Sequence, residues 1–189
     1  MAVTVKSEVR TLTPRQRMGR SVNAVAEMLR KRLSVPNIYI EPGSSYINAD
    51  VLAVDRAGAG DLHAVQIRLG LGDDFTKPAA PHQMMNAWMR SIRETMNNRR
   101  NSLMSLPAHY RYLAIPYDRF SLFVAESPSL YSPDGIGRLG VIAVTEHGEE
   151  LPVAEVAIAP ERFRVDPAKL RNIEKKLLEK VRPDIEVRI

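Results

Sequence analysis

The sequence predicts a single α/β domain in which a mixed β-sheet is flanked by helices. Apolar residues recur at helical spacing after Thr13-Pro14 and again after Asp166-Pro167, and each pair combines a capping residue with a proline suited to the first helical turn. Between them, short runs alternate apolar and polar residues, which is typical of strands. The 189 residues suffice to bury one core without disulfides. We therefore treat residues 1–189 as one domain, with a core over about 13–163 and a C-terminal helix over about 166–182.

The first predicted helix begins at Thr13-Pro14 and has one apolar and one basic face. Its apolar residues are Met18, Val22, Val25, Ala26, Leu29 and Leu33. Its basic residues are Arg15, Arg17, Arg20, Arg30, Lys31 and Arg32. The basic face is either a solvated surface or an approach for phosphates. A short strand from Ile38 to Glu41 follows.

Two alternating apolar runs then predict a β-hairpin, with strands Asp50–Asp55 and Leu62–Arg68 joined by a turn that contains two glycines. Successive side chains of a strand point to opposite faces of the sheet. Gln66 and Arg68 should therefore share one face, with Ile67 on the other.

The remaining elements alternate between helices and strands. They are a helix from Pro81 to Met104, a strand from Tyr110 to Ile115, an ambiguous segment from Asp118 to Ser129, a hairpin of Leu139–Val144 with Leu151–Ile158, a helix from Asp166, and an edge strand from Ile185 to Ile189. In the helix from Pro81, the stripe of Met85, Trp88 and Met89 indicates core packing rather than a ligand site. The same helix carries Arg90 and Arg93.

Composition narrows the class of protein. The absence of cysteine removes disulfides, thiolate nucleophiles and cysteine-based zinc sites, and fits a reducing compartment. No apolar stretch approaches the ~18 residues that span a bilayer, so we expect a cytoplasmic protein without a membrane partner. The net charge of +5 and the pI near 9.6 favour a polyanionic partner such as nucleic acid.

Other catalytic patterns are weak. The histidines lack the paired spacing of a metal-binding helix: His63, His82, His109 and His147. Gly58-Ala59-Gly60 lacks the third glycine and the strand-to-helix setting of a dinucleotide-binding turn. The hairpin therefore carries the main functional signal.

Asp50 at the start of one strand and Gln66-Ile67-Arg68 at the end of the next resemble the core of the PD-(D/E)xK nuclease superfamily. In that superfamily an acid on one strand and an acid-x-lysine on the next hold a divalent metal and orient the attacking water. The predicted order of helix, strand, hairpin, helix and strand is also the order of the superfamily core. The resemblance extends from Thr13 to Phe163 and implies a restriction-endonuclease-like fold.

The resemblance also implies roles at the site. Asp50 would be a ligand of Mg²⁺ or Mn²⁺, and Glu27 on the first helix would be an accessory ligand. Gln66 stands in place of the second acid and brings no negative charge, while Arg68 stands in place of the lysine. Arginine binds phosphate well but stays protonated, so it is better suited to binding a nucleic-acid backbone than to transferring a proton. Cleavage is therefore expected to be impaired or lost.

An alternative restores cleavage through a carboxylate or a lysine supplied by another segment. The candidates are Asp55, Asp61, Asp73, Asp74, Glu94 and Lys77. The simpler interpretation is that the acids among them shape turns and loops.

The predicted function is that of a nucleic-acid-binding domain, with DNA as the expected partner. The expected contacts are Arg17, Arg20, Arg68, Arg90 and Arg93. One alternative is an active Mg²⁺- or Mn²⁺-dependent nuclease with a non-standard site. Another is an assembly module on the same fold, whose partner is a different protein or a second copy of the chain. The sequence does not decide whether the protein is an enzyme.

Overall fold

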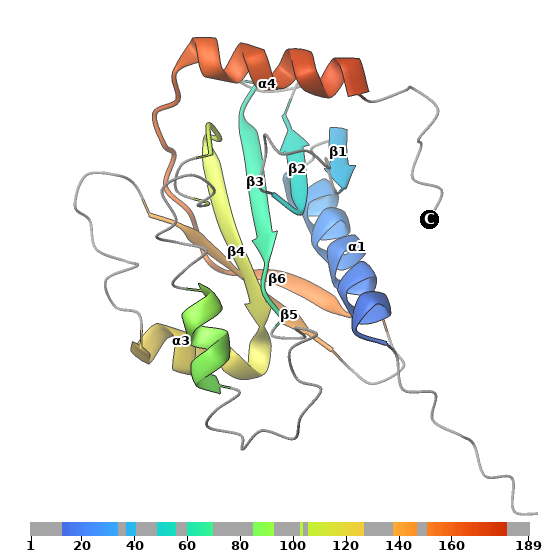
Figure 1. The fold of residues 1–189 in the computed structure, drawn as a ribbon, viewed down its shortest axis with the longest axis vertical. Coiled ribbons are helices and arrows are strands. Elements are labelled where there is room, and N and C mark those ends of the chain that lie inside the picture. Colours follow the sequence, from blue (N-terminus) through green and yellow to red (C-terminus); the bar gives the residue numbers. More distant parts are fainter. Residues whose placement is uncertain are drawn as a thin grey trace, which may run out of the picture.

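In the part of the chain that the computed structural model describes, six β-strands form one open mixed sheet in the order β1-β2-β3-β4-β5-β6 (Figure 1). The strands are β1 Asn37–Ile40, β2 Val51–Val54, β3 Leu62–Ile67, β4 Tyr110–Pro116, β5 Gly140–Thr145 and β6 Val153–Ile158. β1, β2 and β3 are antiparallel neighbours, β4 and β5 run parallel to β3, and β6 returns antiparallel to β5. Both predicted hairpins are confirmed. The structure describes residues 13–33, 37–40, 49–55, 60–69, 85–92, 103, 106–126, 138–146 and 151–180.

The described helices are α1 Pro14–Leu33, the 3-10 helix η3 Tyr117–Arg119, α3 Phe120–Glu126 and α4 Pro167–Lys180, and residues 85–92 are also helical. Two of the described helices, α1 and α4, begin at the caps that the sequence predicts. Thr13 accepts a hydrogen bond from the Gln16 N–H through Oγ1 at 3.3 Å, and its own N–H donates to Gln16 Oε1 at 2.9 Å, forming a capping box. Asp166 Oδ1 accepts a hydrogen bond from the Ala168 N–H at 2.8 Å. None of the helices in the described ranges is long and apolar enough to cross a membrane.

The ambiguous segment after β4 is helical over η3 and α3. The change from strand to helix follows Pro116, which is extended and lacks the N–H that a continuing ladder requires. Phe123 is the fully buried side chain among those described in α3, which is typical of a short helix with one face on the core. The helix predicted over 81–104 is observed over 85–92, while residues 93–102 and the strand predicted over 185–189 lie outside the described residues.

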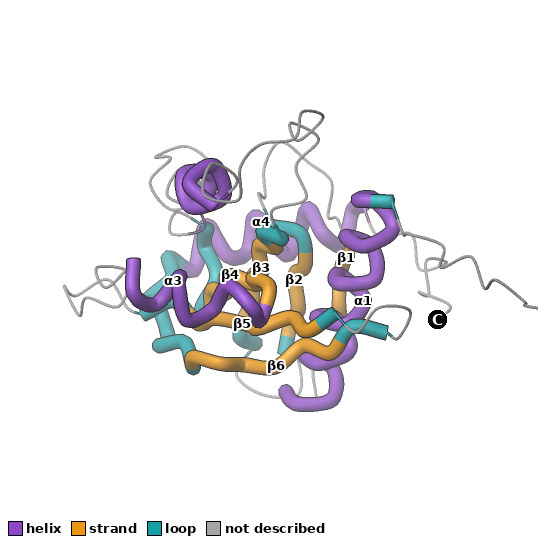
Figure 2. The backbone as a smooth tube through the Cα atoms, turned by 90° about the horizontal axis from the view of Figure 1, so that it is seen from below, coloured by secondary structure: helices purple, strands orange, loops and turns teal. Residues whose placement is uncertain are grey.

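Different helices cover the two faces of the sheet. α1 covers one face, where its Val25 and Leu29 belong to the same buried cluster as Val65 and Ile67 of β3. Residues 85–92, α3 and α4 cover the other face, which includes Leu52, Ala64 and Leu113. Figure 2 shows α1 on the right, beside β1, and α3 on the left, near β4 and β5. The alternation of β3 therefore follows the predicted period of two.

Candidate functional site

Polar side chains gather at both ends of β3. Because β3, β4 and β5 are parallel, their carboxyl ends share one edge of the sheet, and the antiparallel β2 begins there (Figure 1). We call this the carboxyl edge, and it holds Asp50, Arg68, Tyr117, Arg119 and Glu146. The group toward the opposite end of β3, the amino-end cluster, consists of Asp61, His63, His109, Tyr112 and Arg162. The predicted site residues of the hairpin thus fall at the carboxyl edge.

Asp50 and Arg68 are held together at the carboxyl edge. Oδ2 of Asp50 accepts a hydrogen bond from the Ile67 N–H at 2.6 Å and lies 3.5 Å from Nη1 of Arg68. The same Nη1 donates to the Ile67 carbonyl oxygen at 2.8 Å. The carboxylate therefore caps the end of β3 and fixes the guanidinium beside it. Both side chains are half-buried, so the pair remains in contact with solvent.

Gln66 joins this pair, but Glu27 does not. The β2–β3 register places Gln66 opposite Asp50, and its side chain is buried. Glu27 lies on α1, which covers the other face of the sheet, and its carboxylate pairs with Lys31 at 2.7 Å. The hydrogen bond from Lys31 lowers the pKa of Glu27. The structure therefore does not bring Glu27 to Asp50, as the accessory role would require.

Further arginines reach the carboxyl edge from neighbouring segments. Arg17 of α1 donates through Nε to Oε2 of Glu146 at 2.9 Å, which ties the start of α1 to the end of β5 across 129 positions of sequence. The guanidinium carbon of Arg119 lies 5.1 Å from the ring centre of Trp88. The indole Nε1 of Trp88 in turn donates to the Arg68 carbonyl oxygen at 3.0 Å. Residues 85–92 and η3 are thereby fastened to the end of β3.

The other predicted contacts are spread over two helices. Arg20 is half-buried on α1, and Arg90 is exposed on the helical residues 85–92. Arg93 lies outside the described residues. The basic face predicted for α1 is observed, with exposed Arg15, Arg30, Lys31 and Arg32, and this exposure fits a solvated surface as well as an approach for phosphates.

The described donors at the carboxyl edge do not fit a divalent metal. Mg²⁺ and Mn²⁺ favour several hard oxygen ligands, carboxylates above all. The Asp50 carboxylate is engaged with a backbone N–H and a guanidinium, and that of Glu146 is engaged with Arg17. Within the described ranges no three His, Asp or Glu side chains form a group that would hold a metal ion. Asp55 and Asp61 lie at the other end of β3, while residues 73, 74, 77 and 94 fall outside those ranges.

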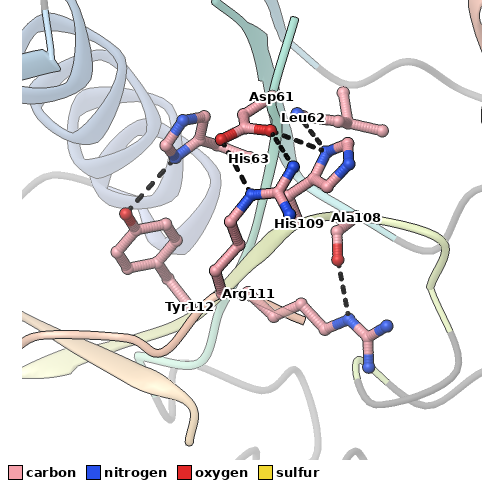
Figure 3. A network of polar contacts seen from close by, with 8 residues as sticks. Asp61, Leu62, His63, Ala108, His109, Arg111 and Tyr112 are labelled. Atoms are coloured by element: carbon pink, nitrogen blue, oxygen red, sulfur yellow. Dashed lines mark hydrogen bonds and ion pairs between the residues drawn. The ribbon is translucent and has the colours of Figure 1, made fainter. Parts of the chain in front are cut away.

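Asp61 is the centre of the amino-end cluster (Figure 3). Its Oδ1 accepts a hydrogen bond from Nη2 of Arg162 at 2.8 Å, and its Oδ2 accepts one from Nε at 3.2 Å. These hydrogen bonds hold the pKa of Asp61 below its usual range. Oδ1 also lies 3.5 Å from Nδ1 of His109, which accepts the Leu62 N–H at 3.0 Å.

The cluster attaches the segment between β6 and α4 to the sheet. Besides the Arg162 contact, the Phe163 N–H donates to the His109 carbonyl oxygen at 2.8 Å. The guanidinium carbon of Arg111 lies 4.0 Å from the ring centre of Phe163, and its Nε donates to the Ala108 carbonyl oxygen at 3.2 Å. Burial lowers the pKa of Arg111 to about 10, so it remains charged at neutral pH. These contacts hold the connection between β6 and α4 against the sheet, which is a structural role.

His63 and two tyrosines lie on the face that α1 covers. Nδ1 of His63 lies 3.3 Å from the Tyr112 hydroxyl, and its ring stacks on Tyr110 at 4.7 Å between ring centres. Burial lowers the pKa of His63 to about 4, against the opposing effect of Asp61 and Asp55. Burial likewise raises the pKa of Tyr112, so both groups are neutral at neutral pH.

Sequence reasoning did not find this cluster. It assigned Asp61 to a turn and treated His63 and His109 as scattered. One signal was present, because Asp61 and His109 each precede a strand by one residue, and the starts of parallel neighbours share an edge. Arg162 gave no such signal, since it belongs to a connection 101 positions away.

We expect Asp61→Asn and Arg162→Gln each to lower the free energy of unfolding at pH 7, and the double variant to lose no more than the larger single loss. Both substitutions remove the same ion pair, so their effects should not add. The lowered pKa stabilises the fold above the ordinary value of 3.8 and stops doing so as pH falls through the folded-state pKa. The differences should therefore shrink below pH 4.

Urea unfolding of the variants at pH 7 and pH 3 measures this prediction, with the exposed Arg164→Gln as the matched control. Additive losses, or losses equal at the two pH values, would contradict it.

Comparisons with known proteins leave the family open. No protein-family model matches the chain, and no curated protein matches it. Among solved structures, the chain is similar to one described as "SPO1766 protein of unknown function from Silicibacter pomeroyi", with 14% sequence identity and a TM-score of 0.48. The match covers 89% of this chain and 86% of that chain.

Proposed function

We propose that the protein binds nucleic acid through the carboxyl edge and that its cleavage site is degenerate. The Asp50–Arg68 pair carries this proposal. In the PD-(D/E)xK superfamily that the chain resembles, an acid and a lysine at these positions serve a metal. Here the two positions are neighbours, yet they form a carboxylate–guanidinium pair beside a neutral Gln66. Such a pair suits phosphate binding better than metal-assisted hydrolysis.

The chain topology supports the resemblance. The order of helix, strand, hairpin, helix and strand, in which residues 85–92 are the second helix, is the order that the resemblance implies. The proposed surface lies at the carboxyl edge, where β3, β4 and β5 end.

The electrostatics of the edge also support phosphate binding. Three guanidinium groups converge on one edge, those of Arg17, Arg68 and Arg119, and two of them are paired with carboxylates there, Arg17 with Glu146 and Arg68 with Asp50. Guanidinium groups bind phosphate oxygens in a planar, bidentate geometry. The net charge of +5 adds long-range attraction for a polyanion.

We expect Arg68→Ala to weaken binding of duplex and single-stranded DNA alike and to reduce the slope of log affinity against log salt by about 1. Anisotropy of a labelled strand across a salt series measures both effects. Arg164→Ala is the matched control, because it removes the same charge from an exposed position in the connection before α4, beside the amino-end cluster. Equal losses for the two variants would mean that net charge, rather than the carboxyl edge, controls binding.

The same samples test cleavage when Mn²⁺ is present and the DNA is afterwards separated on a gel. Intact DNA together with salt-sensitive binding agrees with a degenerate nuclease. If the wild-type protein cuts the DNA and the Asp50→Ala variant does not, the active-nuclease alternative would be favoured, with Asp50 as a metal ligand. No binding at low salt would overturn the proposed function.

Protein assembly is a second candidate, and one observation favours it. Leu151 and Val153 are large apolar side chains that are mostly exposed at the start of β6, an edge strand of the sheet. Exposed apolar groups at an edge strand suit association with another chain. Sedimentation over a concentration series measures self-association of the wild-type protein and of the Val153→Lys variant. If β6 is an assembly surface, the substitution should reduce self-association.

A further inference from the structure

Tyr117 projects from the carboxyl edge. It is the first residue of η3, directly after β4, and it is 55% exposed. The Arg68 N–H donates to the Ala114 carbonyl oxygen at 2.8 Å, so Arg68 lies beside β4 three residues before Tyr117. Arg119, on the same turn of η3, is held against Trp88. An exposed tyrosine thus lies on the same turn as Arg119, three residues beyond the point where the Arg68 backbone contacts β4.

The chemistry of this turn differs from that of a surface made for phosphates alone. Tyr117 offers an aromatic face, and the next residue, Asp118, is exposed and negatively charged at neutral pH. A carboxylate repels the phosphates of a duplex and of a single strand alike, so a preference between the two must come from the ring. An aromatic face gains little from a duplex, because the bases are stacked on one another inside it. The same face stacks readily on a base that has no partner.

We propose that the carboxyl edge binds single-stranded nucleic acid, with Tyr117 stacking on an unpaired base while Arg68 and Arg119 hold the adjoining phosphates. This inference rests on the proposed function and adds the class of nucleic acid that the site selects. Tyr117 supplies the preference for single strands, and the arginines supply the affinity that all nucleic acids share.

Three labelled probes separate these contributions: a single strand of mixed sequence, the same sequence as a duplex, and an abasic strand of the same length, which keeps the phosphates but lacks bases. Wild-type protein should bind the single strand more tightly than either other probe. Tyr117→Ala should weaken single-strand binding about tenfold and leave the other two affinities unchanged. Tyr117→Phe, which retains the ring, should keep the wild-type affinity.

Because Tyr117 is exposed, the Ala variant should fold, and a thermal melt checks this directly. Equal losses on all three probes, or wild-type binding that favours the duplex or abasic strand, would overturn the inference and leave the proposed function standing. Failure of every probe to bind would overturn the proposed function itself. Arg68→Ala serves as the contrasting variant, since it should weaken all three probes together.

Discussion

Acidification from pH 6.5 to about 4 should lower the free energy of unfolding through His63 alone by about 3 kcal/mol. The side chain is 5% exposed, and burial is the main cause of its lowered pKa. Below pH 6.5 the unfolded chain gains a proton on this residue, whereas the folded protein does not until pH approaches 4. The contribution to stability is therefore complete above pH 6.5, declines across this window and then levels off. Each unit by which the folded-state pKa of His63 lies below 6.5 contributes about 1.4 kcal/mol to the free energy of unfolding.

Two variants isolate this contribution. His63→Gln retains a hydrogen-bonding group near the Tyr112 hydroxyl, and His63→Phe retains a ring against Tyr110, but neither side chain titrates. Urea unfolding at intervals between pH 7 and pH 4 should give a flatter dependence for both variants than for the wild type. Comparing the pH dependence of the variants with that of the wild type subtracts the contributions of other titrating groups. One of these is Asp61, which titrates at lower pH because its pKa is lowered from 3.8. Variants with the wild-type slope would show that His63 accepts its proton in the folded state.

Gly140→Ala should lower the free energy of unfolding by about 1–3 kcal/mol, because the site is already filled. A Cβ atom there would lie 2.6 Å from Cδ1 of Tyr112 and 3.0 Å from Cδ of Pro160. The Tyr112 ring pairs with Gly140 across β4 and β5, is buried, and contacts His63 through its hydroxyl. Because the ring is buried, the added Cβ must displace it against its neighbours or move the strands apart.

Gly19→Ala is the matched control for this prediction. Gly19 lies on an exposed position of α1, and nothing lies within 4 Å of the Cβ that alanine would add. Alanine should raise stability there by about 1 kcal/mol, since it has the higher helix propensity. Thermal or urea unfolding of both variants should therefore give changes of opposite sign. A Gly140→Ala protein as stable as the wild type would mean that the Tyr112 ring is not fixed.

Much of the fold was accessible from local patterns in the sequence. Caps at Thr13 and Asp166 define helix starts through short-range hydrogen bonds, and the period-two runs around residues 51–67 define a hairpin because each strand has buried faces. The segment after Pro116 stayed ambiguous, because Phe120, Leu122 and Phe123 suit a buried strand as well as a short helix. Its outcome depends on the packing of Phe123 against the core, which local pattern does not contain.

The candidate site was accessible only where it follows from the hairpin. Register brings Gln66 opposite Asp50, and their closeness follows from strand geometry. The contacts of Arg17 with Glu146 and of Asp61 with Arg162 join segments that no local pattern links. Glu27 shows the opposite case. The resemblance implied a role for it beside Asp50, but the sequence does not reveal which face of the sheet α1 covers. Tertiary packing determines which partner each of these side chains contacts.

The attachment of α1 to the end of β5 has a consequence during synthesis. α1 leaves the ribosome before β5 and β6, against which it packs, and its ion pair with Glu146 spans 129 positions. Its apolar face therefore remains without part of its cover until β5 and β6 have been translated. The parallel pairing of β3, β4 and β5 adds further contacts between distant segments, which slow folding. The nascent chain should thus depend on chaperones until β6 emerges, and truncation before β6 should yield an aggregation-prone product.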